Sequence, residues 1–160
     1  MAFLRGTAIV ETDKGIILGE SAAGRILLPG GRANRGESRF LAAIRELREE
    51  TGLQANAAFT LFEYEDSRDH HKVLWVSAYG NPQPKDDLVA LHYCHKSELS
   101  EFDLNFPEAT NATRNIVKLF WSYKEKNAPL FEKLDAHNSK MANSEILSPE
   151  ILKYKSINFL

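Results

Sequence analysis

Three glutamates are spaced so that their side chains would share one face of a helix. Glu46, Glu49 and Glu50 lie at positions i, i+3 and i+4, which on an α-helix places their carboxylates about one turn apart and pointing the same way. Carboxylates this close repel one another and resist ionisation together. A divalent cation removes that conflict, and oxygen-only ligands favour hard ions such as Mg²⁺ or Mn²⁺. The alternative interpretation is a solvated acidic helix face, the usual meaning of a charge run.

The segment that carries these glutamates has the pattern of an amphipathic helix over residues 38–51. Its larger apolar residues recur at three- and four-residue spacing and form one stripe, made of Phe40, Leu41, Ile44 and Leu47. Gly36 or Ser38 could cap the start of this helix, and Gly52 is a suitable residue to end it. A regular helix here would hold the three carboxylates on the face opposite the apolar stripe.

Other residues stand in fixed register with these glutamates. The positions that each demand one residue type are Gly31, Glu37, Arg45, Glu46, Glu49, Glu50 and Gly52. At about one chance in twenty per position, an accidental match at a given start has odds on the order of one in a billion. This spacing matches the Nudix box, and the chain resembles a MutT-like Nudix hydrolase over residues 3–123, with the subfamily left open. In this context a metal site is favoured over a merely solvated acidic face.

The resemblance implies the fold and the domain organisation. We expect an α/β fold, an α/β/α sandwich in which a curved mixed β-sheet lies between the box helix and a second helix over residues 107–123. Residues 1–123 would form the Nudix hydrolase domain, and residues 124–160 a C-terminal extension that is partly helical. A helix start is predicted at residues 148–150, because Ser-Pro-Glu places proline at the first helical position. This extension could pack on the domain or on a second subunit, so a homodimer is one alternative.

The resemblance also implies roles for the box residues. Glu46, Glu49 and Glu50 would hold the metal, joined by the backbone carbonyl of Gly30. The structural positions of the box are Gly31, Glu37, Arg45 and Gly52. Arg45 would tie the helix to the preceding loop and orient the carboxylates rather than touch the substrate.

The implied reaction is hydrolysis of a diphosphate bond in a nucleoside diphosphate linked to another moiety. Water attacks phosphorus in a metal-held diphosphate while a carboxylate removes the proton. Glu49 or Glu50 is the first candidate for this base. Glu98 lies in a later loop where many relatives carry a catalytic glutamate, and its alternative is an ordinary surface residue. A Nudix-fold ligand-binding or regulatory module without turnover is the competing function, which the intact box disfavours.

The substrate is not specified by the sequence. The proline and tyrosine that mark ADP-ribose and diadenosine-polyphosphate enzymes of the family are missing from residues 65–71, and the NADH-type signature is also absent. Basic side chains near the box could bind phosphates, and two histidines could contact a phosphate or a base. These substrate-binding candidates are Arg25, Arg32, Arg68, His70 and His71.

Short runs of β-branched and aromatic residues surround the box helix. They predict strands over residues 3–11, 16–20, 25–28, 58–64, 72–79 and 87–94. Both faces of the run 72–79 are apolar, so we expect this strand to be buried on both sides. Residues 81–84 and 97–105 are expected to be loops.

Composition limits the class of protein and its partners. With 160 residues, 43% hydrophobic and 26% charged, the chain is typical of one soluble domain with an appendage. No apolar run approaches the roughly 18 residues of a membrane span, and residues 1–6 lack the apolar core of a signal peptide. A net charge of −2 argues for a small nucleotide-type partner over an extended nucleic acid. Lone Cys94 suggests a reducing, cytoplasmic setting.

Overall fold

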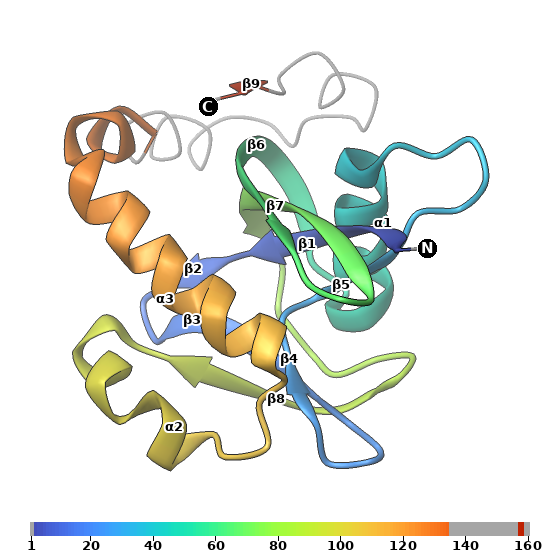
Figure 1. The fold of residues 1–160 in the computed structure, drawn as a ribbon, viewed down its shortest axis with the longest axis horizontal. Helices are drawn as coiled ribbons and strands as arrows, with labels where there is room; N and C mark the ends of the chain where they lie inside the picture. The colour runs from blue at the N-terminus through green and yellow to red at the C-terminus, as the bar shows by residue number, and fades with distance from the viewer. Residues whose placement is uncertain (1, 135–156, 159–160) are drawn as a thin grey trace.

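Strands and helices follow one another along the chain in the order that Figure 1 shows. The computed structural model describes residues 2–134 and 157–158. The elements are β1 (Phe3–Ile9), β2 (Glu11–Thr12), β3 (Gly15–Ser21), β4 (Ile26–Leu27), β5 (Gly30–Arg32), α1 (Arg39–Thr51), β6 (Gln54–Glu65), β7 (Asp69–Tyr79), β8 (Leu88–Cys94), the 3₁₀ helix η1 (Lys96–Glu101), α2 (Phe102–Asn105), α3 (Asn111–Lys126) and β9 (Ile157–Asn158).

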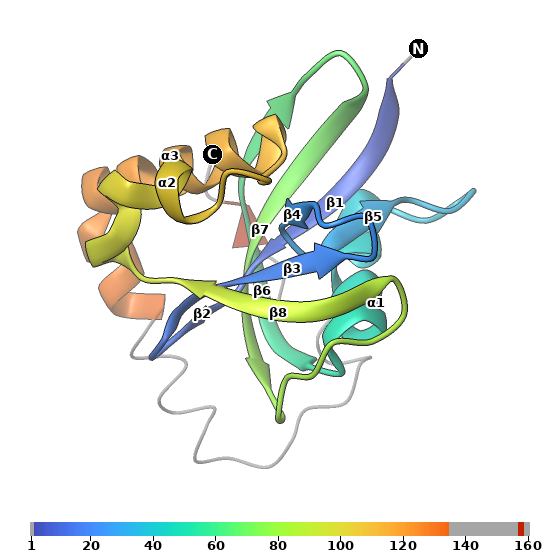
Figure 2. The same ribbon diagram turned by 90° about the horizontal axis from the view of Figure 1, so that it is seen from below.

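The strands are divided between two sheets. The larger has the order β5-β1-β7-β6-β9 and is mixed, because β1 pairs in parallel with β7 whereas β5 and β6 pair antiparallel with their neighbours. The smaller joins β2, β3 and β4, and β8 pairs antiparallel with β3. Figure 2 shows β3 and β8 running across the direction of β6 and β7.

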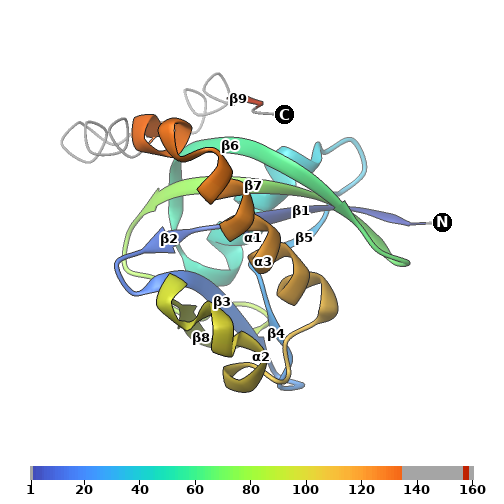
Figure 3. The same ribbon diagram turned by 60° about the vertical axis from the view of Figure 1, so that its left-hand side comes forward.

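Two helices cover opposite faces of the larger sheet. Successive side chains of a strand point to opposite faces, and the buried residues of β1 and β7 divide accordingly. Ile9, Val73 and Trp75 belong to the apolar cluster that includes the buried face of α3. Ala8, Leu74 and Val76 belong to the cluster that includes Leu47 of α1. Figure 3 shows α3 in front of the sheet and α1 behind it, which confirms the predicted α/β/α sandwich with a mixed sheet between the helices.

Local sequence sets both ends of α1. The side chain of Ser38 accepts a hydrogen bond from the backbone N–H of Leu41, so Ser38 is the N-cap. Gly52 has a left-handed conformation (φ 76°) and its N–H donates to the carbonyl of Arg48 at 2.8 Å, which is the usual way in which glycine ends a helix. The predicted helix and its two boundaries are therefore confirmed.

The region after β8 differs from the prediction of a loop over 97–105. It forms η1 and α2, because the side chain of His95 accepts from the N–H of Ser97 and starts a helical turn. The second helix begins at Asn111 rather than at 107, because the hydroxyl of Thr110 caps it by accepting from the N–H of Thr113.

The chain continues as helix beyond the predicted boundary at 123. Helix α3 runs to Lys126, and residues 128–134 are also helical. Phe131 and Leu134 are buried in the same apolar cluster as α3. Further on, β9 pairs in parallel with β6. The helix start expected at 148–150 lies outside the described residues, and the division at 123 stays a prediction.

None of the described helices is long and apolar enough to cross a membrane.

Helix α1 lies directly against β1 where the strand has no side chain. A Cβ atom added to Gly6 would lie 2.0 Å from the carbonyl oxygen of Arg39 and 2.5 Å from the backbone nitrogen of Ala43. Both neighbours are backbone atoms of α1, so a small side chain movement cannot relieve the contact. Gly6 therefore sets the distance between α1 and the sheet, and with it the position of the helical carboxylates.

We predict that Gly6→Ala destabilises the protein by about 1–3 kcal/mol, because an added methyl group forces α1 away from β1. The free energy of unfolding, measured by denaturant titration, checks this. Ala23→Ser is the control, since Ala23 is an exposed turn residue without a left-handed backbone conformation. An equal loss in both variants would contradict the role of Gly6.

Candidate active site

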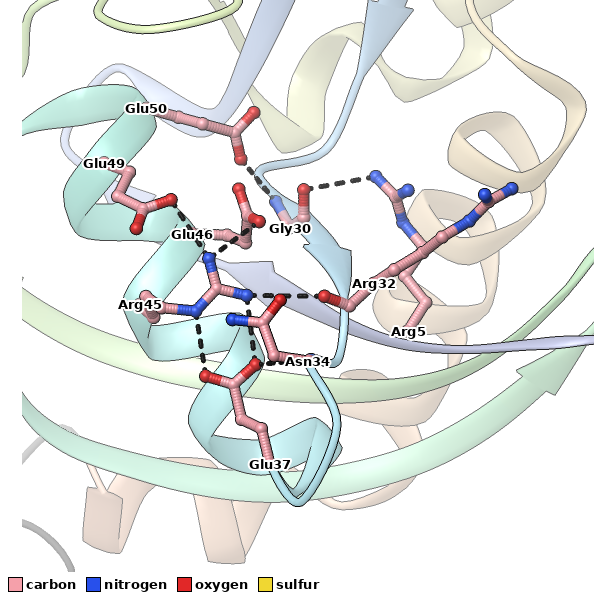
Figure 4. Close-up of polar contacts among 9 residues, drawn as sticks. All are labelled: Arg5, Gly30, Arg32, Asn34, Glu37, Arg45, Glu46, Glu49 and Glu50. Atoms are coloured by element: carbon pink, nitrogen blue, oxygen red, sulfur yellow. Dashed lines mark hydrogen bonds and ion pairs between the residues drawn. The ribbon is translucent and has the colours of Figure 1, made fainter.

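Arg45 is the centre of the polar contacts around the box helix (Figure 4). Its guanidinium donates to both oxygens of Glu37, from Nε at 2.8 Å and from Nη2 at 3.0 Å. Nη1 donates to Glu46 and to Glu49, each at 3.0 Å, and Nη2 reaches the carbonyl of Arg32 at 3.3 Å. The hydrogen bond from Arg45 lowers the pKa of Glu37, and its carboxylate partners raise the pKa of Arg45. Arg45 thus joins α1 to the loop before it and holds two of the box carboxylates.

Glu50 has a different environment from Glu49, although the two are neighbours. Glu50 is buried, with 5% of its surface exposed, and its Oε1 accepts a hydrogen bond of 2.9 Å from the N–H of Gly30. Burial raises its pKa to about 7, against the opposing effect of that hydrogen bond. Burial also raises the pKa of Glu46. The two carboxylates on the inner side of α1 therefore lie where negative charge is costly.

The glycine pair at the start of β5 lets these carboxylates reach past the edge of the sheet. A Cβ atom on Gly31 would lie 2.5 Å from the carboxyl carbon of Glu46. Gly30 has φ 152°, and a Cβ there would lie 2.3 Å from the carbonyl oxygen of Gly6. Any side chain at either position would occupy the space that the sheet and the carboxylates now use.

A cavity of about 1000 Å³ opens at this edge of the sheet. Glu46 and Glu50 line it on one side, together with Gly30 and Gly31. Three of the predicted phosphate-binding residues, Arg25, Arg32 and Arg68, also line it. The cavity lies on the α3 side of the larger sheet, since its lining includes Ile116.

The structure separates the two histidines that the sequence treated as a pair. His71 lines the cavity and is 5% exposed, and its Nδ1 lies 2.8 Å from the hydroxyl of Thr7. Burial lowers the pKa of His71, helped by the nearby charge of Arg5. His70 points to the opposite face because adjacent residues of a strand alternate, and it lies 3.5 Å from Glu65. His70 is not among the cavity-lining residues.

Glu98 is also placed away from the cavity. It is an exposed residue of η1, which follows β8 of the smaller sheet, and the cavity lining does not include it. The later acidic residues that do line the cavity are Glu108, which precedes α3, and Asp87, in the loop between β7 and β8. That loop is held to the end of α1, since the N–H of Lys85 donates to the carbonyl of Glu50 at 2.9 Å.

Arg5 is a further site residue that the sequence reasoning missed. It lines the cavity, and its Nη2 donates to the carbonyl of Gly30 at 3.2 Å. Arg5 and Thr7 lie on the same face of β1 as Ile9, which belongs to the apolar cluster on the α3 side, and so they face the cavity. The sequence did contain a signal for this residue, because Arg5 is the only charged residue of β1.

The residues around α1 suit a hard divalent cation by their chemistry. Arg45 engages one oxygen each of Glu46 and Glu49, and the Gly30 amide engages one oxygen of Glu50. The second oxygens can serve as ligands, and carboxylate oxygens are what Mg²⁺ and Mn²⁺ prefer. Burial raises the pKa of Glu50, so a cation bound beside it would stabilise its ionised form. In the described residues no three acidic, histidine or cysteine side chains already converge on one point.

The comparisons with known proteins agree with this geometry. A family model described as the NUDIX domain matches residues 3–121. The chain belongs to the Nudix family. It is a Nudix hydrolase, and members of this family are generally pyrophosphohydrolases. Among curated proteins, no relative matches this Nudix chain.

Solved structures share the fold over 76% to 91% of this Nudix hydrolase. A nudix hydrolase family member from Chromobacterium violaceum is 28% identical, with a TM-score of 0.73 over 91% of this chain and 98% of its own. The ORF135 protein of E. coli is 26% identical, with a TM-score of 0.62 over 77% of this chain and 91% of its own. A bifunctional NMN adenylyltransferase/ADP ribose pyrophosphatase from Francisella tularensis, complexed with AMP and a Mn ion, shares the fold at 19% identity, with a TM-score of 0.60 over 76% of this chain and 42% of its own.

We predict that the stability contributed by Glu50 depends on pH in the absence of metal. Its pKa of about 7 in the folded state exceeds the ordinary value of 4.5, so folding favours the protonated form. That contribution is fully present below about pH 4.5 and is lost as pH rises through about 7. Between pH 5 and pH 8, unfolding in a chelator should show wild type losing up to about 3 kcal/mol relative to Glu50→Gln.

Glu101→Gln is the control, because it also removes one carboxylate but at an exposed position of η1. A constant difference between wild type and Glu50→Gln across this pH range would contradict the buried, proton-binding state of Glu50.

Proposed function

We propose that the chain is a divalent-metal-dependent pyrophosphohydrolase that cleaves the diphosphate bond of a nucleotide derivative. The observation that carries this proposal is that two α1 carboxylates, Glu46 and Glu50, and several arginines line one cavity. Carboxylates on one side suit a cation, and arginines suit phosphate oxygens. A cavity of about 1000 Å³ is of the size that holds a small molecule of nucleotide size.

The proposed metal ligands are Glu46, Glu49, Glu50 and the backbone carbonyl of Gly30. When bound, Mg²⁺ or Mn²⁺ would polarise the diphosphate and stabilise the charge that develops during its cleavage. Arg45 would position Glu46 and Glu49 through the hydrogen bonds described above. The Francisella structure, which contains AMP and a Mn ion, supports a nucleotide-type ligand and a divalent ion in this fold.

The proposed base comes from α1. Burial raises the pKa of Glu50 to about 7 in the metal-free protein, and a carboxylate whose pKa is near neutral can accept a proton from water provided that the accepting oxygen is not itself a metal ligand. Glu49 is more exposed, with 40% of its side chain accessible, and is the second candidate. Glu98 remains a sequence-based prediction that no contact in the cavity supports.

The proposed phosphate-binding residues are arginines from several elements. Arg5 reaches the carbonyl of Gly30, next to the proposed metal site. Arg25, Arg32 and Arg68 surround the same cavity. Arg32 is positioned by Phe3, since its guanidinium carbon lies 3.5 Å from the centre of that ring. Together they could hold the phosphate groups on either side of the bond that is cleaved.

We predict that Glu49→Gln and Glu50→Gln each lower Mg²⁺-dependent hydrolysis roughly hundredfold to ten-thousandfold, the range expected for a lost general base. The measurement is release of phosphate or of a nucleoside monophosphate, with unfolding curves to confirm the fold. Glu101→Gln is the surface control. Glu98→Gln should keep most of the activity, because Glu98 lies on η1 and not among the α1 carboxylates. Undiminished turnover in both α1 variants would contradict the assigned site.

The substrate itself requires a panel assayed with Mg²⁺ or Mn²⁺ and product identification. It should include modified deoxynucleoside triphosphates, ADP-ribose, dinucleoside polyphosphates, nucleotide sugars and 5′-triphosphate RNA. We expect turnover of at least one small nucleotide derivative, abolished by a chelator. Ligand binding without turnover of any member would instead favour a regulatory Nudix module.

A further inference from the structure

Two buried polar atoms of β7 have no hydrogen-bond partner in the described part of the chain. The Nε2 atom of His71 makes no hydrogen bond, although its Nδ1 is 2.8 Å from Thr7 Oγ1. The Oδ1 atom of Asp69 makes none either, since Arg32 Nε lies 3.7 Å away, beyond hydrogen-bond distance. A buried polar group without a hydrogen-bond partner is destabilising. Two of them in side chains that line a cavity indicate a ligand that supplies their partners.

Both side chains face the cavity because of their register. Residues i and i+2 of a strand point to the same face, and Asp69 and His71 lie opposite Phe3 and Arg5 of β1. Since β1 separates β7 from β5 and neighbouring strands lie about 4.8 Å apart, His71 is about 10 Å from β5 across the sheet. The unpartnered atoms therefore lie at some distance from Gly30 and the α1 carboxylates.

The unpartnered atoms at this end of the cavity differ in kind from the arginines of the proposed diphosphate site, which they adjoin through Arg32, 3.7 Å from Asp69, and Arg5, opposite His71. A carboxylate such as Asp69 only accepts hydrogen bonds and repels phosphate. His71 is neutral near pH 7, because burial and the charge of Arg5 lower its pKa, and so it offers a single nitrogen of fixed direction. The pair suits an uncharged group that carries N–H or O–H donors rather than a further phosphate.

We propose that Asp69 and His71 are specificity-determining residues that bind the part of the substrate attached to the diphosphate. Oδ1 of Asp69 accepts from an N–H or O–H of that part, and Nε2 of His71 makes a second hydrogen bond to it. The contact with Thr7 fixes the imidazole ring in the required orientation. This inference rests on the proposed function, because the diphosphate would direct its attached nucleobase or sugar toward this end.

The test measures binding to the metal-free protein, so that it does not depend on turnover. The ligands are the 5′-monophosphates of adenosine, cytidine, guanosine and uridine, ribose 5-phosphate, and inorganic phosphate. Calorimetry gives the affinities, and the imidazole NMR signals of His71 report contact directly. We expect Asp69→Asn and His71→Gln to weaken binding about tenfold to hundredfold, as the loss of one or two buried hydrogen bonds implies.

His70→Gln is the matched control, since the structure places His70 on the opposite face of the same strand, and its affinity should equal that of wild type. A shift of the His71 signals by ribose 5-phosphate identifies a sugar, and a shift only by nucleoside monophosphates identifies a nucleobase. Both results support the proposal.

The proposal is overturned if no ligand binds, if only inorganic phosphate binds, or if ligands bind without shifting the His71 signals. It is also overturned if folded Asp69→Asn and His71→Gln proteins bind as tightly as His70→Gln. A separate assay with Mg²⁺ distinguishes the two hypotheses: binding that depends on Asp69 and His71 without any hydrolysis would refute the proposed function and leave this inference standing.

Discussion

Mutual repulsion among three carboxylates on neighbouring turns of α1 is the constraint on which the rest of the structure depends. Arg45 offsets it for Glu46 and Glu49 by donating to both from one guanidinium nitrogen. Glu37 in turn fixes Arg45 through two hydrogen bonds. Glu50 has no hydrogen bond to a cation; its Oε1 accepts from the Gly30 amide, and burial raises its pKa to about 7 in spite of that bond. The helix therefore holds a cluster that is only partly neutralised, which is the state in which a divalent cation would bind best.

Missing side chains are as important to the site as the charged ones. At Gly6 the absence of a side chain lets α1 lie against β1, and at Gly31 it leaves room for Glu46. Glu46 and Glu50 project from α1, on one side of the sheet, whereas the cavity lies on the other side. Their side chains can reach it only past the edge strand β5, where Gly30 and Gly31 have no side chains. The glycines of β1 and β5 thus both help to place the α1 carboxylates at the cavity: Gly6 lets the helix lie close to the sheet, and Gly30 and Gly31 leave room for the carboxylates at its edge.

Because successive side chains of a strand alternate, the two faces of β7 pack against different helices. Leu74 and Val76 pack toward α1, whereas Val73 and Trp75 pack toward α3. Nearer the start of the same strand, the face on the α3 side carries Asp69 and His71 into the cavity. One strand thereby contributes to both apolar clusters and to the polar lining. Side chains far apart in the sequence, from β1, β5, α1 and β7, meet around one cavity as a result.

The sequence by itself determined the box, the helix that carries it, its end at Gly52 and the sandwich fold, because these depend on local spacing and on a pattern shared by the family. It left Gly36 and Ser38 as alternative caps for the start of the helix, and the structure shows that Ser38 is the cap. Only the tertiary structure decided that Arg5 joins the site, that His71 lines the cavity while His70 does not, and that Glu98 lies elsewhere. Those outcomes depend on strand register and on where a 3₁₀ helix directs the chain. Register follows from pairing between segments more than 60 residues apart, such as β1 with β7, and no local pattern of residues specifies it.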